Sequence, residues 1–434
     1  MLSNTKNWQP IKNDKLIKNI EYVVKQVARK LQSPHTVLGE PISGTESLAS
    51  GALGIVLFYA ELDRLYPEEQ WDVVAHNYLV YVQTAINANT FQSLSLWSGL
   101  SGAPVVASIL ARNRGRYQNF IEKLHILMQP AIDEFINQAR GRIGSSLFMP
   151  DYDVIEGLAG IGRYLLSFKE HPKCKENLNK VLAYTVQLTK DIQVNGRNVP
   201  GWHIKSENQF LEHEQKRYPH GNFNLGISHG IAGPFALLSL ALLEGVKVAG
   251  QREAIRKLCS YYGKWKAEDE HGPIWPERIS FEEETCGQVQ NNFAYNASWC
   301  YGEPSIARVL WLAGEALGDI VIKSLAQEVY LSLVQRSVEL ASPTFCHGDA
   351  GTLWMLQRMM MDTDSDVFEA YREKLVNKIL NSYNENNAYG FQDIEQGQSQ
   401  DVPGLLVGAA GVALVLLSCL SLDEPEWDCI FLLK

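Results

Sequence analysis

Runs of apolar residues, each opened by a pair of glycines, recur along the chain. The motif Gly-x-x-Gly followed by an apolar stretch is present six times, and a seventh, degenerate copy has Ser305 in place of its second glycine. Such stretches predict buried helices, and glycines one helical turn apart suit a helix end that neighbouring backbones approach closely. The first glycines of the copies are Gly51, Gly99, Gly157, Gly230, Gly302, Gly348 and Gly408.

More polar segments separate these runs. Residues 76–86, 117–136 and 366–379 carry apolar residues on one helical face, which predicts amphipathic partner helices. Seven such pairs predict an all-α protein. The last copy is the most apolar instead of forming a polar cap. We therefore expect a closed α/α toroid of seven helix-pair repeats rather than an open solenoid.

The two longest intervals between copies indicate insertions. Residues 189–222 are polar and contain Asn-Gly and Val-Pro-Gly turn signals around short β-branched pieces, which predicts a small α+β subdomain. Residues 265–292 are expected to form an irregular loop. The predicted organisation is thus one discontinuous toroid domain, residues 1–188 and 223–434, interrupted by the insertion at 189–222.

One apolar segment, residues 404–422, permits two interpretations. It has 19 residues and no charge, which is enough to span a bilayer, and Gly404 and Gly408 fit a pattern of membrane-helix pairing. It also contains the last copy of the repeat. The repeat favours a buried inner helix.

Composition and charge narrow the class of protein. With 46% apolar and 20% charged residues, the chain can bury a large core, which argues against disorder. A net charge of −10 disfavours a dedicated nucleic-acid binder. Residues 1–20 lack the apolar core of a secretion signal, and the seven cysteines show no regular spacing. We therefore expect the reducing environment of the cytoplasm.

Aligning the copies brings out candidate chemistry. Equivalent positions of a ring lie on one rim, so Cys300 and Cys346, which share one offset in consecutive copies, should lie side by side. A polar residue at the start of a buried apolar helix lowers the stability of the fold, so its presence there indicates a function. The residues directly before the first glycines are Ser50, Ser98, Glu156, His229, Tyr301, His347 and Val407. One position earlier stand Ala49, Trp97, Ile155, Ser228, Cys300, Cys346 and Leu406.

The two cysteines and His347 form a donor set that suits zinc. Three protein ligands for one Zn²⁺ leave a fourth position for water or substrate, which is typical of a catalytic site. His229 shares the offset of His347 and is a candidate acid or base. Four other cysteines are expected to be small apolar residues of the buried core: Cys174, Cys259, Cys419 and Cys429.

Three carboxylates, Asp151, Asp153 and Glu156, precede the third copy. One interpretation is that they cap the following helix and balance its dipole. The other is that one of them orients the histidine. The sequence leaves both open.

At these residues the chain resembles the LanC-type lanthipeptide cyclases. The resemblance rests on WCYG (299–302), CHG (346–348), SHGIAG (228–233) and YDVIEGLAGIG (152–162), covers nearly the whole chain, and through IKSENQ (204–209) is strongest to the class I bacterial enzymes. It implies an α/α toroid with a small SH2-like insertion. It also implies zinc held by Cys300, Cys346, His347 and water, with His229 as the catalytic histidine and Asp153 as its acidic companion.

The resemblance has one departure. The class I pattern has an arginine four residues before the WCYG cysteine, and Asn296 stands in that place here. Any substrate-binding or histidine-orienting role of that arginine is therefore in doubt for this chain.

The activity implied by the resemblance is zinc-dependent cyclisation in lantibiotic maturation. Cysteine thiols of a dehydrated precursor peptide would add to dehydroalanine or dehydrobutyrine and form (methyl)lanthionine thioether rings. The implied partners are that peptide, a dehydratase and an export transporter, in the cytoplasm or peripherally at the inner face of the cell membrane.

Two alternatives remain beside this activity. One is a zinc-stabilised toroid that binds peptides without turnover, with Cys286 as the nearest spare fourth ligand. The other is a toroid glycosidase that uses two of Asp151, Asp153 and Glu156. The glycosidase leaves Cys300, Cys346 and His347 without a role.

Overall fold

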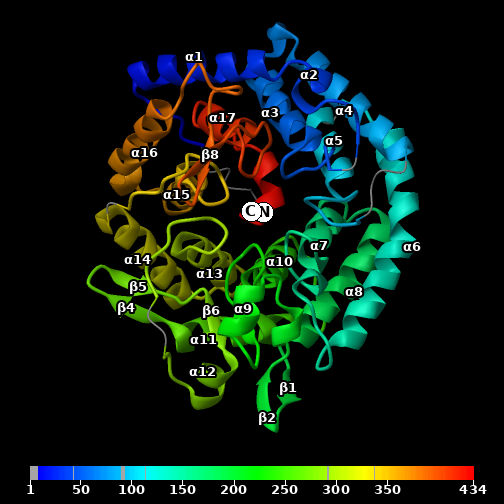
Figure 1. Cartoon of the computed structure of the whole chain (residues 1–434), viewed down its shortest axis with the longest axis vertical. Coiled ribbons are helices and arrows are strands. Elements are labelled where there is room, and N and C mark those ends of the chain that lie inside the picture. The colour runs from blue at the N-terminus through cyan, green and yellow to red at the C-terminus, as the bar shows by residue number, and fades with distance from the viewer. Residues whose placement is uncertain (1–7, 43, 89–92, 113, 291–292, 337) are drawn as a thin grey trace.

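Two concentric rings of helices form the body of the protein (Figure 1). The computed structural model describes residues 8–42, 44–88, 93–112, 114–290, 293–336 and 338–434. In these residues the inner ring comprises α3 (Ala52–Leu65), α5 (Gly102–Ala111), α7 (Leu158–Ser167), α10 (Ala232–Leu243), α13 (Glu303–Leu317), α15 (Asp349–Thr363) and α17 (Ala409–Ser418). The outer ring comprises α1 (Asp14–Lys30), α4 (Trp71–Asn87), α6 (Gln118–Arg142), α8 (Pro172–Leu188), α11 (Gln251–Trp265), α14 (Ile320–Arg336) and α16 (Glu369–Asn381).

The rings are closed. Helix α17 of the last repeat packs against α3 of the first, and α1 packs against both α16 and α17. The predicted all-α toroid of seven helix pairs is confirmed, since each glycine motif opens one inner helix and an outer helix accompanies it.

The helices of the inner and outer rings differ in their pattern of apolar residues. Inner helix α10 is apolar all round, and every residue from Ala232 to Leu242 is buried. Outer helix α1 buries only one stripe, which includes Leu16, Ile20 and Val27. A helix between two layers of neighbours needs apolar residues on every face, whereas an outer helix needs only one such face.

The second glycine of the motif is required by a close approach of backbone. The loop before each inner helix folds back on the first helical turn. A Cβ at Gly54 would lie 2.6 Å from the carbonyl oxygen of Leu48, and a Cβ at Gly102 would lie 2.6 Å from that of Leu96. In the degenerate copy the Ser305 hydroxyl donates to the Gly302 carbonyl at 2.7 Å.

The predicted strands of the first insertion are present. A hairpin of β1 (Asp191–Val194) and β2 (Arg197–Pro200) is followed by α9 (Glu212–Arg217) and β3 (Asn222–Asn224). Strand β3 pairs with β6 (Arg278–Ser280) of the following interval, so the two inserted regions are joined. The boundaries of a separate subdomain and its SH2-like character stay predictions.

The second inserted region is not the irregular loop that the sequence suggested. It contains the hairpin of β4 (Ala267–Asp269) and β5 (Gly272–Ile274), then β6 and α12 (Phe281–Cys286), while residues 291–292 lie outside the described residues. Strands this short carry too little alternation to be recognised. The hairpin of β7 (Asp393–Glu395) and β8 (Gln398–Gln400) was missed for the same reason.

Shorter helices complete the described elements. They are α2 (Pro34–Leu38), η1 (Pro67–Glu69), η2 (Met149–Asp151), η3 (Ser206–Asn208), η4 (Asp366–Phe368) and η5 (Trp427–Phe431).

The apolar segment 404–422 is an inner helix and not a membrane span. Helix α17 within it has 10 residues, all buried in the ring. Among the described residues, no helix combines the length and apolar character that crossing a bilayer requires. The interpretation that the repeat favoured is confirmed.

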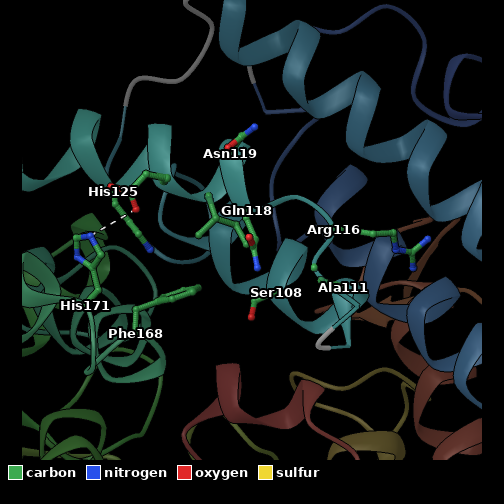
Figure 2. Close-up of a pocket in the computed structure, with 11 residues that line it drawn as sticks. Ser108, Ala111, Arg116, Gln118, Asn119, His125, Phe168 and His171 are labelled. Carbon is green, nitrogen blue, oxygen red and sulfur yellow. Dashed lines mark ion pairs between the residues drawn. The ribbon is translucent and has the colours of Figure 1, made fainter.

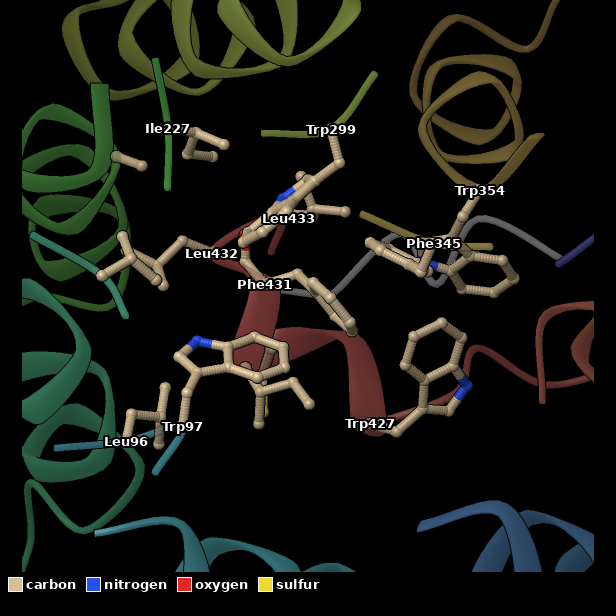
Figure 3. Packing of buried hydrophobic residues seen from close by; sticks show 14 of the residues in the cluster. Leu96, Trp97, Ile227, Trp299, Phe345, Trp354, Trp427, Phe431, Leu432 and Leu433 are labelled. Atoms are coloured by element: carbon tan, nitrogen blue, oxygen red, sulfur yellow. The ribbon is translucent and has the colours of Figure 1, made fainter. Parts of the chain in front are cut away.

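The middle of the ring is filled by residues 427–433, which include η5. Figure 3 shows Phe431 among the rings of Trp97, Trp299 and Phe345. These side chains are fully buried. The repeat pattern did not predict that a segment outside the repeats fills the ring.

Candidate functional site

The loops that lead into the inner helices are joined along one rim of the toroid. At six of the seven junctions a backbone N–H of one loop donates to a carbonyl of the next loop. The donor–acceptor pairs include Leu48 to Trp97, Val154 to Ser228, Ile227 to Cys300, Cys300 to Cys346, Cys346 to Leu406 and Leu405 to Ala49. The six acceptors are all residues that the repeat alignment placed at one offset, so the predicted equivalence of these copies holds in space.

This rim brings the predicted site residues into neighbouring loops. Asp153 precedes α7, His229 precedes α10, Cys300 precedes α13, and Cys346 with His347 precedes α15. Because the loops are consecutive in the ring, four repeats contribute to one continuous stretch of the rim.

The two cysteines form a hydrogen-bonded thiol pair. The hydrogen bond from the Cys346 thiol lowers the pKa of Cys300, and the same bond raises the pKa of Cys346 well above its usual value. The Ser298 hydroxyl lies 3.4 Å from the Cys300 sulfur and also lowers the pKa of Cys300. The predicted adjacency of the two cysteines is therefore present.

His347 is held by a carboxylate that sequence reasoning missed. Its Nε2 atom lies 2.9 Å from Oδ1 of Asp393, on strand β7. The same oxygen accepts hydrogen bonds from the hydroxyls of Ser342 at 2.7 Å and Thr344 at 3.1 Å. This contact occupies Nε2 and leaves Nδ1 as the nitrogen that could bind a metal.

His229 and Asp153 form a second polar pair. The Nδ1 atom of His229 lies 2.6 Å from Oδ2 of Asp153, whose other carboxylate oxygen accepts the backbone N–H of Glu156 at 2.8 Å. The Asp153 side chain is 0% exposed and that of His229 is 28% exposed. Burial raises the pKa of Asp153, and the hydrogen bond from His229 opposes that rise.

The first insertion supplies a ring beside His229. Phe210, between η3 and α9, meets the imidazole edge-on, with ring centroids 5.5 Å apart. Phe210 is 51% exposed, so an apolar surface borders the histidine.

The two remaining carboxylates have other partners. Asp151 is buried and forms an ion pair with Arg142 at 2.5 Å, and Glu156 accepts a hydrogen bond from Ser98 at 2.5 Å. Of the three candidates, Asp153 is the one bonded to the histidine. Each of the three carboxylates therefore has its own partner, which is Arg142 for Asp151, His229 for Asp153 and Ser98 for Glu156.

Asn296 shapes the loop before Cys300. Its side-chain oxygen accepts the Ser298 N–H at 2.9 Å, and its amide nitrogen lies 3.3 Å from Oε1 of Glu277. The neighbouring Arg278 stacks on the Tyr301 ring at 5.2 Å and pairs with Glu214 of α9 at 2.5 Å. A guanidinium next to the cysteine loop therefore comes from β6, and nothing in the repeat alignment pointed to it.

The chemistry of the donors fits zinc, while their assembly into a metal site remains a prediction. Two sulfurs in contact and an imidazole oriented by a carboxylate are the parts of a thiolate-rich zinc site. Within the described ranges, no group of three or more His, Cys, Asp or Glu side chains is gathered to hold a metal ion. Cys286 is exposed and hydrogen-bonded within its own turn, to the carbonyl oxygens of Glu283 and Gln288.

A cavity of about 620 Å³ lies away from this rim. Its lining includes Ser108 and Phe168, which lie at the C-terminal ends of α5 and α7, whereas the rim lies at the N-terminal ends of these helices. Figure 2 shows His125 and His171 grouped at one side of this cavity and Arg116 directed away from them. Burial lowers the pKa of His125 to about 4, so this histidine is neutral at physiological pH. These polar groups do not converge on one point.

Comparisons with known proteins identify the family and the fold of this chain. The family described as lanthionine synthetase C-like protein matches residues 43–432. The nisin biosynthesis protein NisC of Lactococcus lactis subsp. lactis is 26% identical over 374 residues, which cover 86% of this chain and 85% of that protein. The solved structure of nisin cyclase matches with a TM-score of 0.81 at 25% identity and covers 97% of this chain and 98% of the cyclase.

Proposed function

The chain belongs to the lanthionine synthetase C-like family, and from this membership we propose that it closes thioether rings in a dehydrated precursor peptide. One observation carries the proposal. The thiol pair of Cys300 and Cys346 and the His229–Asp153 pair lie on consecutive loops of one rim.

The reaction is an addition without oxidation or reduction. The sulfur of a peptide cysteine forms a bond to the β-carbon of dehydroalanine or dehydrobutyrine, and the electron pair of the alkene moves to the α-carbon. The thiol proton leaves sulfur and one proton arrives at the α-carbon. The product is lanthionine or methyllanthionine, with the same mass as the substrate.

His229 is suited to handle these protons. Asp153 is fully buried and accepts from Nδ1, which fixes the tautomer and leaves Nε2 to take up the thiol proton or to return a proton to the α-carbon. The partial exposure of the imidazole permits contact with a peptide. The exposed face of Phe210 would lie against apolar parts of that peptide.

Cys300, Cys346 and the Nδ1 atom of His347 would hold one Zn²⁺, with water in the fourth position. When bound, zinc lowers the pKa of a coordinated thiol so that its thiolate exists at neutral pH. Asp393 would orient His347 for this role through Nε2.

The predicted partners belong to the same proposal. The alkenes of the substrate arise from serine and threonine by loss of water, so a dehydratase must act first. An export transporter at the inner face of the membrane would receive the finished product.

The proposal is tested by counting free thiols on a dehydrated nisin-type precursor peptide before and after incubation. Cyclisation conserves mass, so thiols are alkylated and the adducts counted by mass spectrometry, while zinc per chain is measured in parallel. We expect wild type and Cys286→Ala to hold about one zinc and close rings. Cys346→Ala should lose both zinc and ring closure and remain folded.

Other results would change the interpretation. Ring closure by Cys346→Ala at the wild-type rate would overturn the proposal. A protein that holds zinc yet closes no rings would be the peptide-binding scaffold. If Cys346→Ala loses its fold together with zinc, the metal is structural.

A further inference from the structure

The residues directly before the two cysteines share one buried partner. Trp299 precedes Cys300 and Phe345 precedes Cys346, and both rings pack against Phe431 (Figure 3). The centroid distances from Phe431 are 5.2 Å to Trp299 and 3.7 Å to Phe345. The Trp299 indole N–H also donates to the Phe431 carbonyl at 3.4 Å.

Neighbouring residues of these loops face opposite directions. Trp299 and Phe345 are fully buried in the middle of the ring, whereas the two cysteines are partly exposed at the rim. Because each aromatic residue directly precedes its cysteine in the chain, the position of the buried aromatic side chain limits the position of the sulfur. The ring of Phe431 therefore links two loops whose thiols must meet.

The segment that carries Phe431 is fixed in place by buried charges. Asp428 accepts a hydrogen bond from the Trp354 indole at 2.8 Å and forms an ion pair with Arg358. Arg308 donates to the Leu433 carbonyl at 2.8 Å. Arg308 lies on α13 and Arg358 on α15, the helices that follow the two cysteines. A buried ion pair with these extra hydrogen bonds resists displacement.

We propose that Phe431 is a positioning residue for the Cys300–Cys346 thiol pair. It acts through Trp299 and Phe345 and touches neither the substrate nor the sulfurs. The inference rests on the proposed function only in taking the two cysteines as the working thiols.

The test compares two phenylalanines of equal burial. Phe431→Leu removes the ring that links the two loops. Phe58→Leu is the matched control, because Phe58 is also fully buried and packs on Tyr59 within α3, at a ring distance of 5.4 Å. Both variants lose a fully buried aromatic ring, and the melting temperature of each is measured so that a loss of stability is told apart from a change of position. Phe431→Tyr retains the ring; its buried hydroxyl lowers the stability of the protein, but the two loops should keep their wild-type positions.

The first measurement needs no metal. Diamide oxidises the zinc-free protein: the two thiols lose two electrons and two protons, a sulfur–sulfur bond forms, and diamide is reduced to the hydrazine. Peptide mapping then follows the Cys300–Cys346 disulfide. We expect equal rates for wild type, Phe58→Leu and Phe431→Tyr, and a slower rate for Phe431→Leu, because disulfide formation needs a narrow geometry.

The second measurement is zinc affinity by competition with a chromophoric chelator. We expect Phe431→Leu to bind zinc about 10-fold more weakly than Phe58→Leu, the scale seen when a residue that orients a metal ligand is removed. If Phe431→Leu does not fold, Phe345→Leu removes the other ring of the contact and carries the same expectations.

The outcomes separate this inference from the proposed function. Equal disulfide rates for Phe431→Leu and Phe58→Leu overturn the positioning role. A wild-type protein that binds no zinc overturns the zinc proposal, and the diamide rates still decide the role of Phe431.

Discussion

The loops before α3 and α5 carry no candidate chemistry, whereas those before α7, α10, α13 and α15 do, and all of them belong to the same rim. In the two plain loops a pair of serines closes the turn. The hydroxyl oxygens of Ser47 and Ser50 lie 3.4 Å apart, and those of Ser95 and Ser98 lie 2.9 Å apart. In each, the first serine accepts the backbone N–H of the second.

Two of the functional loops, those before α7 and α13, use the same turn. Asp153 occupies the place of Ser47 and Ser95, accepts the backbone N–H three residues later, and has a second oxygen left for His229. Ser298 accepts the Tyr301 N–H at 3.4 Å and also contacts the Cys300 sulfur. The turn is thus retained in these two loops, where Asp153 replaces the serine before α7 and Cys300 follows the serine before α13.

The largest expected effect comes from removing the histidine. His229→Ala should lower the rate of ring closure by about 10²- to 10⁴-fold, the usual contribution of a positioned acid or base. Zinc content should stay at the wild-type value, because the imidazole lies outside the proposed ligand set, whereas the melting temperature should fall, because the fully buried Asp153 loses its partner. The rate is measured by thiol counting on the dehydrated peptide.

Ser50→Ala is the control for this variant, since Ser50 has the same offset in a plain loop. It should keep the wild-type rate. If both substitutions slow ring closure equally, the distinction between plain and functional loops is wrong.

A smaller effect is expected when the functional loop is converted to the plain one. Asp153→Ser retains the acceptor for the Glu156 N–H and removes the contact to His229. We expect ring closure to slow by less than in His229→Ala, because the imidazole remains but loses the carboxylate that fixes its tautomer and orientation. Rates on the dehydrated peptide and thermal melts are compared with wild type.

Asp153→Asn is the matched variant, because it retains the shape of the side chain. Its amide can place an N–H donor opposite Nδ1 and favour the other tautomer of His229. Both variants should therefore fold and be slow. Full activity in Asp153→Ser would show that the carboxylate serves the turn alone.

The repeat made much of this rim predictable. An offset counted from a glycine places Cys300 beside Cys346 and brings His229 into the neighbouring loop, because equivalent positions of a closed ring meet on one side. The interval lengths also located the insertion that supplies Phe210. Each of these inferences used spacing within the repeats, which the ring preserves.

Residues outside the repeats could not be found in this way. Asp393 reaches His347 from a three-residue strand, and Phe431 reaches the cysteine loops from a segment that follows the last inner helix. Arg278 comes from the second inserted region. Their contacts join parts of the chain whose approach depends on ring closure and on long-range packing, and neither leaves a local pattern.

The smallest expected effect concerns a buried acid directly after the WCYG motif. Glu303 begins α13, at an offset where α3 and α17 have alanine. Its oxygens accept the backbone N–H groups of Trp275 at 3.3 Å and Asn296 at 2.8 Å. Burial raises the pKa of Glu303 from 4.5 to about 8, although these hydrogen bonds and Arg336 oppose the rise.

The sign of the pH dependence follows from this raised pKa. The stability that neutral Glu303 contributes is fully present below pH 4.5 and is lost as the pH rises toward about 8. Glu303→Gln is neutral at every pH, so its melting temperature relative to wild type should rise between about pH 5 and about pH 9. Ser305→Ala, in the same turn of α13, is the uncharged control and should keep a constant difference. If the melting temperatures of wild type and Glu303→Gln changed in parallel with pH, ionisation of Glu303 would cost the folded protein no stability. Glu303 would then contribute no pH dependence to the stability, like the alanines at this offset in α3 and α17.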